Sequence, residues 1–132
     1  MKVCVVGAGG VGGLLAAVLR RAGVDVSLLV TERHVAPIRS KGLTLIGPKE
    51  QFSVELQAET DPRAIGACDV VVVTVKNWAV EALAPTLQPL LGEDTAVIPL
   101  QNGIDAPEIL ARTLGWRHVV YGSASKIGRA HV

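Results

Sequence analysis

The chain has 132 residues, 49% of them hydrophobic, and its 13 basic and 12 acidic side chains leave a formal net charge of +1. This length suits one domain with a single core, and the scattered charges argue against a nucleic acid or an anionic membrane surface as the main partner. Polar residues interrupt every apolar run and a strand begins almost at once, so we expect no membrane span, no signal peptide and a cytoplasmic protein.

The first elements follow the order strand, glycine turn, helix, strand. An apolar strand is predicted over Lys2–Val6, and the turn GAGGVG at Gly7–Gly12 follows it directly. A helix over Val11–Ala22 ends at Gly23, the residue type expected just past a helix end. A second strand over Asp25–Val30 completes a βαβ unit of about 30 residues, the length of the dinucleotide-binding motif.

The middle of the chain interrupts this alternation. A short helix is predicted over Thr31–Lys41, broken at its start by Pro37. Apolar and polar residues then alternate in Leu43–Ile46 and Phe52–Leu56, and the turn sequence GPKE separates the two runs. We predict a β-hairpin inserted at the edge of the sheet.

Strands and helices alternate again in the second half, where Asp61-Pro62 opens a short helical turn. The alternation predicts an α/β fold of the Rossmann type, with a doubly wound and mainly parallel sheet. The remaining predicted elements are a valine strand (Val70–Val75), a helix split or kinked by Pro85 and Pro89 (Trp78–Leu91), a strand (Thr95–Leu100), a helix (Asp105–Leu114) and a last strand (His118–Gly122).

The last seven residues, KIGRAHV at Lys126–Val132, show neither turn chemistry nor periodicity. They look like the in-frame translation of a common sequencing adapter. We therefore expect residues 1–125 to form the dinucleotide-binding domain and residues 126–132 to be a non-native tail, with the true continuation of the chain missing.

The glycine turn is the main candidate for binding a cofactor. Gly7 would permit the tight turn, Gly9 would let the backbone approach a diphosphate, and Gly12 would let helix and strand pack closely. The predicted cofactor-binding residues of the turn are Gly7, Ala8, Gly9, Gly10, Val11 and Gly12. The alternative is a tight strand-to-helix turn that holds no ligand.

Two further polar clusters follow strands at the same end of the sheet, where ligands of open α/β sheets bind. Lys76 follows the valine strand and could bind ribose hydroxyls or an anionic substrate. Asn102 follows the next strand and could donate to and accept from a ribose or a 2-oxo acid. The alternatives are a solvated lysine at a helix start and an ordinary Asn-Gly turn.

The end of the second strand bears on the choice between NAD and NADP. Thr31 and Arg33 suit the 2′-phosphate of NADP, whereas Glu32 between them could turn inward and repel it. All three could also be solvated loop residues.

No catalytic residue and no metal site is predicted in this chain. Cys4 and Cys68 lack CxxC spacing and adjoin valine runs, so we expect buried thiols that pack as small hydrophobes. The three histidines are dispersed, and no serine has a GxSxG context. We expect Trp78 to pack beneath the loop at its helix start.

Four segments in order are more specific than the glycines alone: KVCVVGAGGVGG, TERHVAPIRSKGLTL, VVVVTVKNW and PLQNG. Together, up to about Lys126, they resemble the N-terminal domain of the ketopantoate reductase (2-dehydropantoate 2-reductase) family. In that family the glycine turn holds the diphosphate, the lysine of VKxW contacts the cofactor, and the asparagine of the NG pair contacts both the nicotinamide end and the substrate. The resemblance gives these roles to Gly7–Gly12, Lys76 and Asn102.

The resemblance implies an NADPH-dependent reduction of ketopantoate, a small 2-oxo acid, to pantoate in pantothenate and coenzyme A biosynthesis. Many members carry an arginine where this chain has Thr31. The family's catalytic lysine and glutamate lie in an all-helical C-terminal domain that this chain lacks, so we expect the fragment to be inactive. The alternatives are a related NAD(P)-dependent reductase of another 2-oxo acid and a non-catalytic nucleotide-sensing module.

Overall fold

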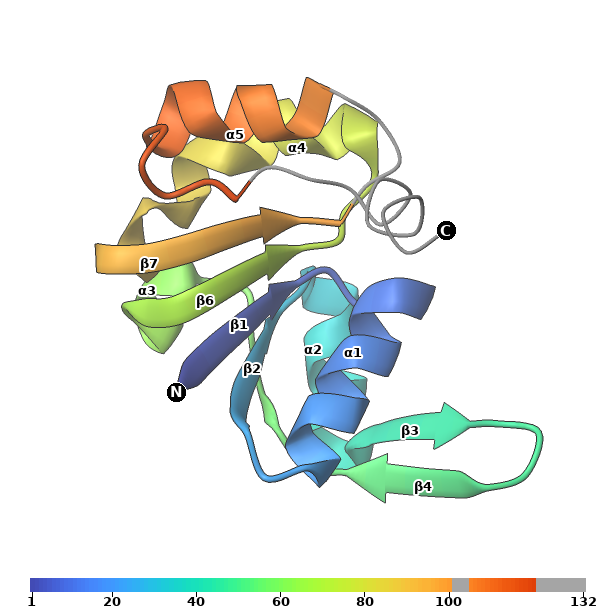
Figure 1. The fold of residues 1–132 in the computed structure, drawn as a ribbon. Helices are drawn as coiled ribbons and strands as arrows, with labels where there is room; N and C mark the ends of the chain where they lie inside the picture. The colour runs from blue at the N-terminus through green and yellow to red at the C-terminus, as the bar shows by residue number, and fades with distance from the viewer. Residues whose placement is uncertain (101–104, 121–132) are drawn as a thin grey trace, which may run out of the picture.

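Five parallel strands form the main sheet, in the order β5-β2-β1-β6-β7 (Figure 1). The computed structural model describes residues 1–100 and 105–120. Because β1 lies in the centre and the chain builds outward from it in both directions, the sheet is doubly wound, as the sequence predicts. The strands are β1 (Lys2–Val6), β2 (Asp25–Leu29), β5 (Gln57–Glu59), β6 (Cys68–Val73) and β7 (Leu91–Pro99).

Helices cover both faces of this sheet, and each face has its own hydrophobic cluster. Successive side chains of a strand point to opposite faces, so β1 contributes Val3 and Val5 to one cluster and Cys4 and Val6 to the other. The first cluster packs against α1 (Gly10–Arg21) and α2 (Glu32–Lys41); the second packs against α4 (Asn77–Leu83), the 3₁₀-helix η1 (Ala84–Leu90) and α5 (Asp105–Leu114). The four-residue helix α3 (Pro62–Ile65) precedes β6.

Prolines act differently in the two predicted helices that contain them. Pro37 lies inside α2 without breaking it, contrary to the prediction, because proline removes only one backbone donor and the buried side chains of Val35 and Ile38 on either side hold the helix to the sheet. Between Asn77 and Leu90 the predicted split is confirmed. The α-helix ends at Leu83, and the segment that contains Pro85 and Pro89 winds as a 3₁₀-helix.

The predicted hairpin is present, formed by β3 (Leu43–Ile46) and β4 (Gln51–Val54), but it makes a separate two-stranded sheet. It packs against the end of α1, where Arg21 forms an ion pair of 2.7 Å with Glu50 and its guanidinium lies 4.3 Å from the centre of the Phe52 ring. The edge of the main sheet is instead β5, a strand that we did not predict and that pairs with β2.

The remaining predicted strands are confirmed with shifted bounds. β6 begins two residues before the predicted valine run, and β7 begins four residues before Thr95. Of the last predicted strand, Val119 forms one parallel bridge with Val97, and residues 121 and 122 lie outside the described residues. The predicted tail also lies outside them.

Both cysteines are buried and free, as predicted. A hydrogen bond with Cys68, together with burial, raises the pKa of the Cys4 thiol, which keeps it protonated and unreactive. Within residues 1–100 and 105–120, no three His, Cys, Asp or Glu side chains gather in a metal-binding arrangement. No helix in the same ranges has the length and apolar character that crossing a membrane requires.

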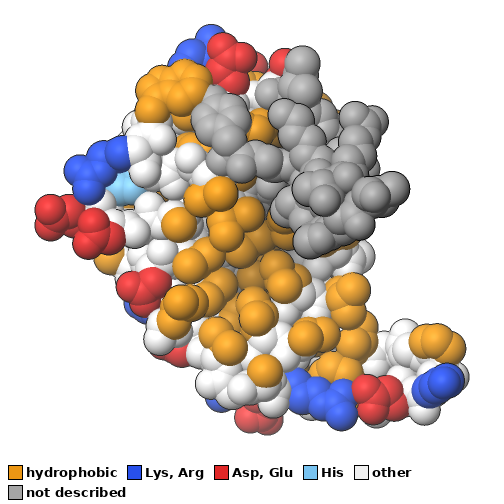
Figure 2. Space-filling view, viewed as in Figure 1, with side chains coloured by type: hydrophobic (Ala, Val, Ile, Leu, Met, Phe, Trp, Pro, Cys, Tyr) orange, Lys and Arg blue, Asp and Glu red, His pale blue; other side chains and the backbone are white. Residues whose placement is uncertain are grey.

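Helix α1 carries apolar residues on its outer side as well as on its sheet side. Val11, Leu14 and Val18 follow the spacing of a helical stripe and are each about half exposed. Figure 2 shows hydrophobic side chains gathered over the face of the molecule that carries α1 in Figure 1. Such a stripe is typical of a helix that contacts another apolar surface.

The buried hydroxyl of Thr95 joins β6 to the start of β7. It donates to the carbonyl of Cys68 and accepts from the backbone N–H of Gly92 at 2.7 Å. Thr95→Val keeps the shape but removes both hydrogen bonds, so we expect the free energy of unfolding to fall by about 1–3 kcal/mol. Urea denaturation measures it. The control is Thr44→Val, whose exposed hydroxyl meets that of Ser53, and equal losses in both variants would contradict the prediction.

Candidate functional site

The glycine turn lies at the carboxyl edge of the sheet, between β1 and α1. Gly7 has a φ of +106°, a conformation that favours glycine, and its N–H donates to the carbonyl of Leu29 at 2.9 Å. A Cβ on Gly12 would lie 2.1 Å from the carbonyl oxygen of Gly7 and 2.5 Å from the hydroxyl of Thr74. The fold therefore requires glycine at position 12 whether or not a ligand binds.

Gly9 is different, because nothing in the folded chain requires a glycine there. Its backbone is extended, it caps the N-terminus of α1, and a Cβ placed on it would meet no atom within 4 Å. The first turn of α1 carries no acidic side chain and the cap makes no side-chain hydrogen bond, so neither supplies an acceptor to the first N–H groups of the helix. A diphosphate needs such free donors and close backbone approach, so the turn fits a dinucleotide.

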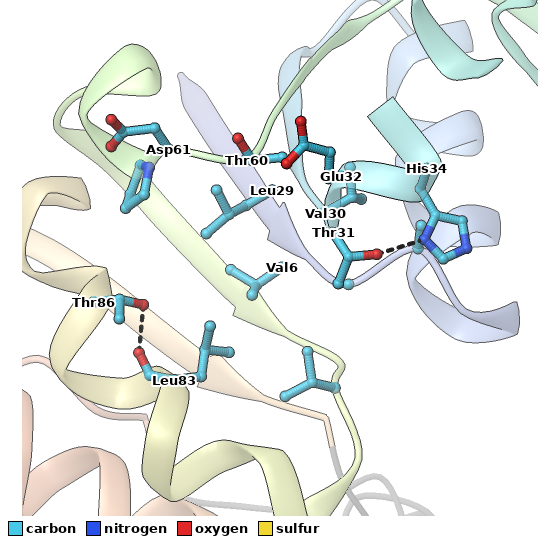
Figure 3. A pocket seen from close by; sticks show the side chains of 14 residues that line it. Val6, Leu29, Val30, Thr31, Glu32, His34, Thr60, Asp61, Leu83 and Thr86 are labelled. Carbon is cyan, nitrogen blue, oxygen red and sulfur yellow. Dashed lines mark hydrogen bonds between the residues drawn. The ribbon is translucent and has the colours of Figure 1, made fainter. Parts of the chain in front are cut away.

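A cavity of about 660 Å³ opens beside this turn (Figure 3). Its floor is apolar, and most of its polar groups lie at the end formed by the residues after β2 and after β5; Thr86 in η1 is the exception among the described lining side chains. Lining residues come from the ends of β1 and β2, the start of α2, the loop into α3, and the α4–η1 region: Val6, Gly7, Ala8, Leu29, Val30, Thr31, Glu32, His34, Thr60, Asp61, Pro62, Val75, Leu83 and Thr86.

The polar end of this cavity contains two carboxylates. Glu32 is the first residue of α2, and Asp61 caps α3 by accepting from the N–H of Arg63 at 2.9 Å. Hydrogen bonds from the Arg63 side chain also lower the pKa of Asp61, so this carboxylate stays charged at neutral pH. The Thr31 hydroxyl lies 2.9 Å from Nδ1 of His34, within hydrogen-bond distance (Figure 3).

The structure brings some of the predicted cofactor-binding residues to the cavity and leaves others beside it. Gly7 and Ala8 line it, whereas Gly12 is buried beneath the turn. Gly9, Gly10 and Val11 are exposed at the start of α1.

The structure tests only one of the two cofactor-binding residues predicted after the later strands, Lys76 and Asn102. Lys76 is exposed at the N-cap of α4, one residue after the cavity-lining Val75, and does not itself line the cavity. Asn102 lies outside the described residues, so its cofactor- and substrate-binding roles stay predictions.

Three lining residues were not predicted. Thr60 follows β5, beside the end of β2, and Leu83 and Thr86 belong to α4 and η1; none of these segments carries a recognisable motif. Only Asp61-Pro62, a typical helix-start pair, gave a local signal in this region.

The prediction for Trp78 was wrong, because this side chain is 84% exposed. Val80 is the buried residue of α4, and two helical residues span about 200° around the axis, so Trp78 points away from the core.

Comparisons with known proteins agree with this geometry. A family model described as ketopantoate reductase PanE/ApbA matches residues 3–130. The 2-dehydropantoate 2-reductase of Mesorhizobium japonicum is 36% identical over 105 residues, which cover 79% of this chain and 32% of the relative. The crystal structure of 2-dehydropantoate 2-reductase from Geobacter metallireducens superposes with a TM-score of 0.83 at 31% identity, covering 90% of this chain and 40% of that one.

A third similarity concerns the fold alone. D-mandelate dehydrogenase, solved in a ternary structure with NADH and anilino(oxo)acetate, superposes with a TM-score of 0.83 at 24% identity and covers 90% of this chain and 39% of that one. The chain spans about a third to two-fifths of the length of these relatives. With nearly all of its residues matched by the family model and the glycine turn at the carboxyl edge of a doubly wound sheet, the chain belongs to the ketopantoate reductase PanE/ApbA family.

Proposed function

We propose that the protein to which this chain belongs reduces ketopantoate to pantoate, and that this chain supplies the nucleotide-binding part. The observation that carries the proposal is the cavity that begins at Gly7 and Ala8 and continues along the ends of β1 and β2. Turn and cavity together offer phosphate-binding N–H groups beside an apolar recess suited to a base. Ketopantoate is proposed as the substrate from the family to which the chain belongs.

Within this proposal the residues at the carboxyl edge have separate roles. The N–H groups at the start of α1 bind the diphosphate, with Gly9 giving it room. Lys76 contributes a positive charge at the exposed start of α4, and Asn102 hydrogen-bonds the nicotinamide ribose and the substrate. When bound, the nicotinamide supplies the hydride.

NADPH is the hydride donor that the family resemblance favours. The phosphate that distinguishes it from NADH would lie near the residues that follow β2, among them Thr31 and Glu32. The carbonyl oxygen of the substrate also needs a proton, and the resemblance places the proton donor in the family's helical C-terminal domain.

Two measurements test the proposal. We expect the 132-residue chain to bind a reduced nicotinamide dinucleotide, detected by calorimetry, and to leave ketopantoate unreduced in an absorbance assay at the nicotinamide wavelength. In the completed protein, Asn102→Ala should lower kcat far more than it lowers nucleotide affinity. Reduction of ketopantoate by the 132 residues alone would refute the proposal that this chain binds the nucleotide but does not by itself catalyse the reaction.

The same completed protein separates this function from the alternatives. A reductase of a different 2-oxo acid would turn over that acid and not ketopantoate. A nucleotide-sensing module would bind the dinucleotide and show no turnover with any 2-oxo acid, and Asn102→Ala would then have no activity to remove.

A further inference from the structure

The polar end of the cavity carries negative charge and no described cationic side chain. Glu32 and Asp61 line it, and none of its described lining residues is a lysine or an arginine. Asp61 is paired with Arg63 at 2.9 Å. Glu32 forms no ion pair with any residue in the described ranges, so its charge is uncompensated at the place where the ribose of a dinucleotide would lie.

Glu32 and Arg33 are neighbours in sequence but not on the helix surface. Consecutive residues of an α-helix are separated by about 100° around its axis. Glu32 lies on the cavity side of α2, and Figure 3 shows it turned toward Thr60 on the opposite segment. Glu32 and Arg33 are both exposed to solvent, but Arg33 is not among the residues that line the cavity.

The other nearby arginine on α2 is already engaged. Arg39 donates from Nε to the carbonyl of Ala58 at 3.0 Å and pairs with the Glu59 carboxylate through its terminal nitrogen. Binding a phosphate through Arg39 would break these contacts between α2 and β5. Thr31, which stands where many family members have an arginine, brings no charge.

We propose that this cavity selects a dinucleotide with a free 2′-hydroxyl, NADH, over NADPH, and that Glu32 is the residue that sets this preference. A carboxylate can accept a hydrogen bond from a ribose hydroxyl, whereas it repels the dianionic 2′-phosphate. This inference rests on the proposed nucleotide-binding function. For this chain it reverses the cofactor preference that the family resemblance favours.

The size of the preference follows from the charges. Two like charges in contact near a protein surface repel each other, and water screens part of this repulsion because Glu32 is exposed, so we expect NADH to bind about tenfold more tightly than NADPH. Because screening by salt weakens this repulsion, the ratio should decrease as the ionic strength rises.

The test is a titration of the 132-residue chain with NADH and with NADPH by calorimetry, repeated for Glu32→Gln and Arg33→Gln. Glu32→Gln keeps the shape and removes the charge, so we expect it to bring the two affinities to within about threefold by strengthening NADPH binding. Arg33→Gln is the matched control on the adjacent exposed position and should leave the ratio unchanged. Thermal unfolding of both variants checks that the fold is intact.

The outcomes separate this inference from the proposed function. If neither nucleotide binds, the nucleotide-binding function fails and the inference fails with it. If NADPH binds more tightly and Arg33→Gln removes that advantage, Arg33 is the selective residue and the inference is overturned, while the proposed function stands. A ratio that is unchanged in Glu32→Gln also overturns it.

Discussion

Gly12→Ala is expected to lower the free energy of unfolding by about 3 kcal/mol, the upper end of the usual cost of overpacking, or to prevent folding. The added Cβ would lie 2.1 Å from the carbonyl oxygen of Gly7, which is backbone and cannot rotate away as a side chain could. Gly7 is itself held by its N–H, which donates to the carbonyl of Leu29. Relief would require α1 to move off the sheet, which would expose the residues buried beneath it.

Urea denaturation of Gly12→Ala and Gly13→Ala measures this effect against a matched control. A Cβ on Gly13 would meet only the carbonyl oxygen of Ala8, at an ordinary 3.6 Å. Because alanine is the better helix former, Gly13→Ala should stabilise the chain by about 0.5–1 kcal/mol. Similar stabilities for the two variants would show that the close approach of α1 to β1 is not the constraint described above.

Gly9→Ala is expected to lower stability only modestly and to weaken dinucleotide binding by about tenfold or more. A Cβ on Gly9 meets nothing within 4 Å and its extended backbone is open to alanine, but alanine is a poorer N-cap than glycine, so we expect the free energy of unfolding to fall by no more than about 1 kcal/mol. The methyl group would instead fill the space through which a diphosphate approaches the backbone, and each tenfold loss in affinity corresponds to about 1.4 kcal/mol.

Calorimetric titration with NADH, together with urea denaturation, distinguishes the two quantities. Gly92→Ala is the control, since Gly92 lies at the opposite end of β7 from the cavity and its added Cβ would make ordinary contacts of 3.6 and 3.7 Å. It should keep full affinity. Unchanged NADH binding by Gly9→Ala would mean that the ligand does not approach the turn at this residue, which would weaken the proposed function directly.

The first βαβ unit could be predicted from the sequence because its determinants are local. Apolar runs, a glycine turn and a glycine at the helix end lie in the residues that they organise, and β1, α1 and β2 have nearly the expected bounds. β5 could not be predicted in this way. It is a three-residue strand with glutamine and glutamate at its ends, and its pairing with β2, about 30 residues earlier, makes it a strand.

In the candidate site, too, residues within a local motif could be predicted, whereas residues placed by tertiary packing could not. Gly7 and Ala8 were identified from their motif, and they line the cavity. The sequence left open which of Glu32 and Arg33 faces the site, because a shift of one residue in the start of α2 would turn both side chains by about 100° around the helix axis. Leu83, the last residue of α4, and Thr86, in the 3₁₀-helix η1, complete the cavity from segments whose position against the strands no local pattern reports.

The position of β1 at the centre of the sheet has a consequence for how the chain folds. This strand is synthesised well before its neighbour on one side, β6, which begins only at Cys68. Until that residue has been made, β1 would be an edge strand with apolar side chains on both faces, an arrangement prone to pairing with other chains. Such long-range parallel pairing is slow to form. Chains that end before β6 should therefore aggregate, whereas chains that extend through α5 can close both hydrophobic clusters around β1.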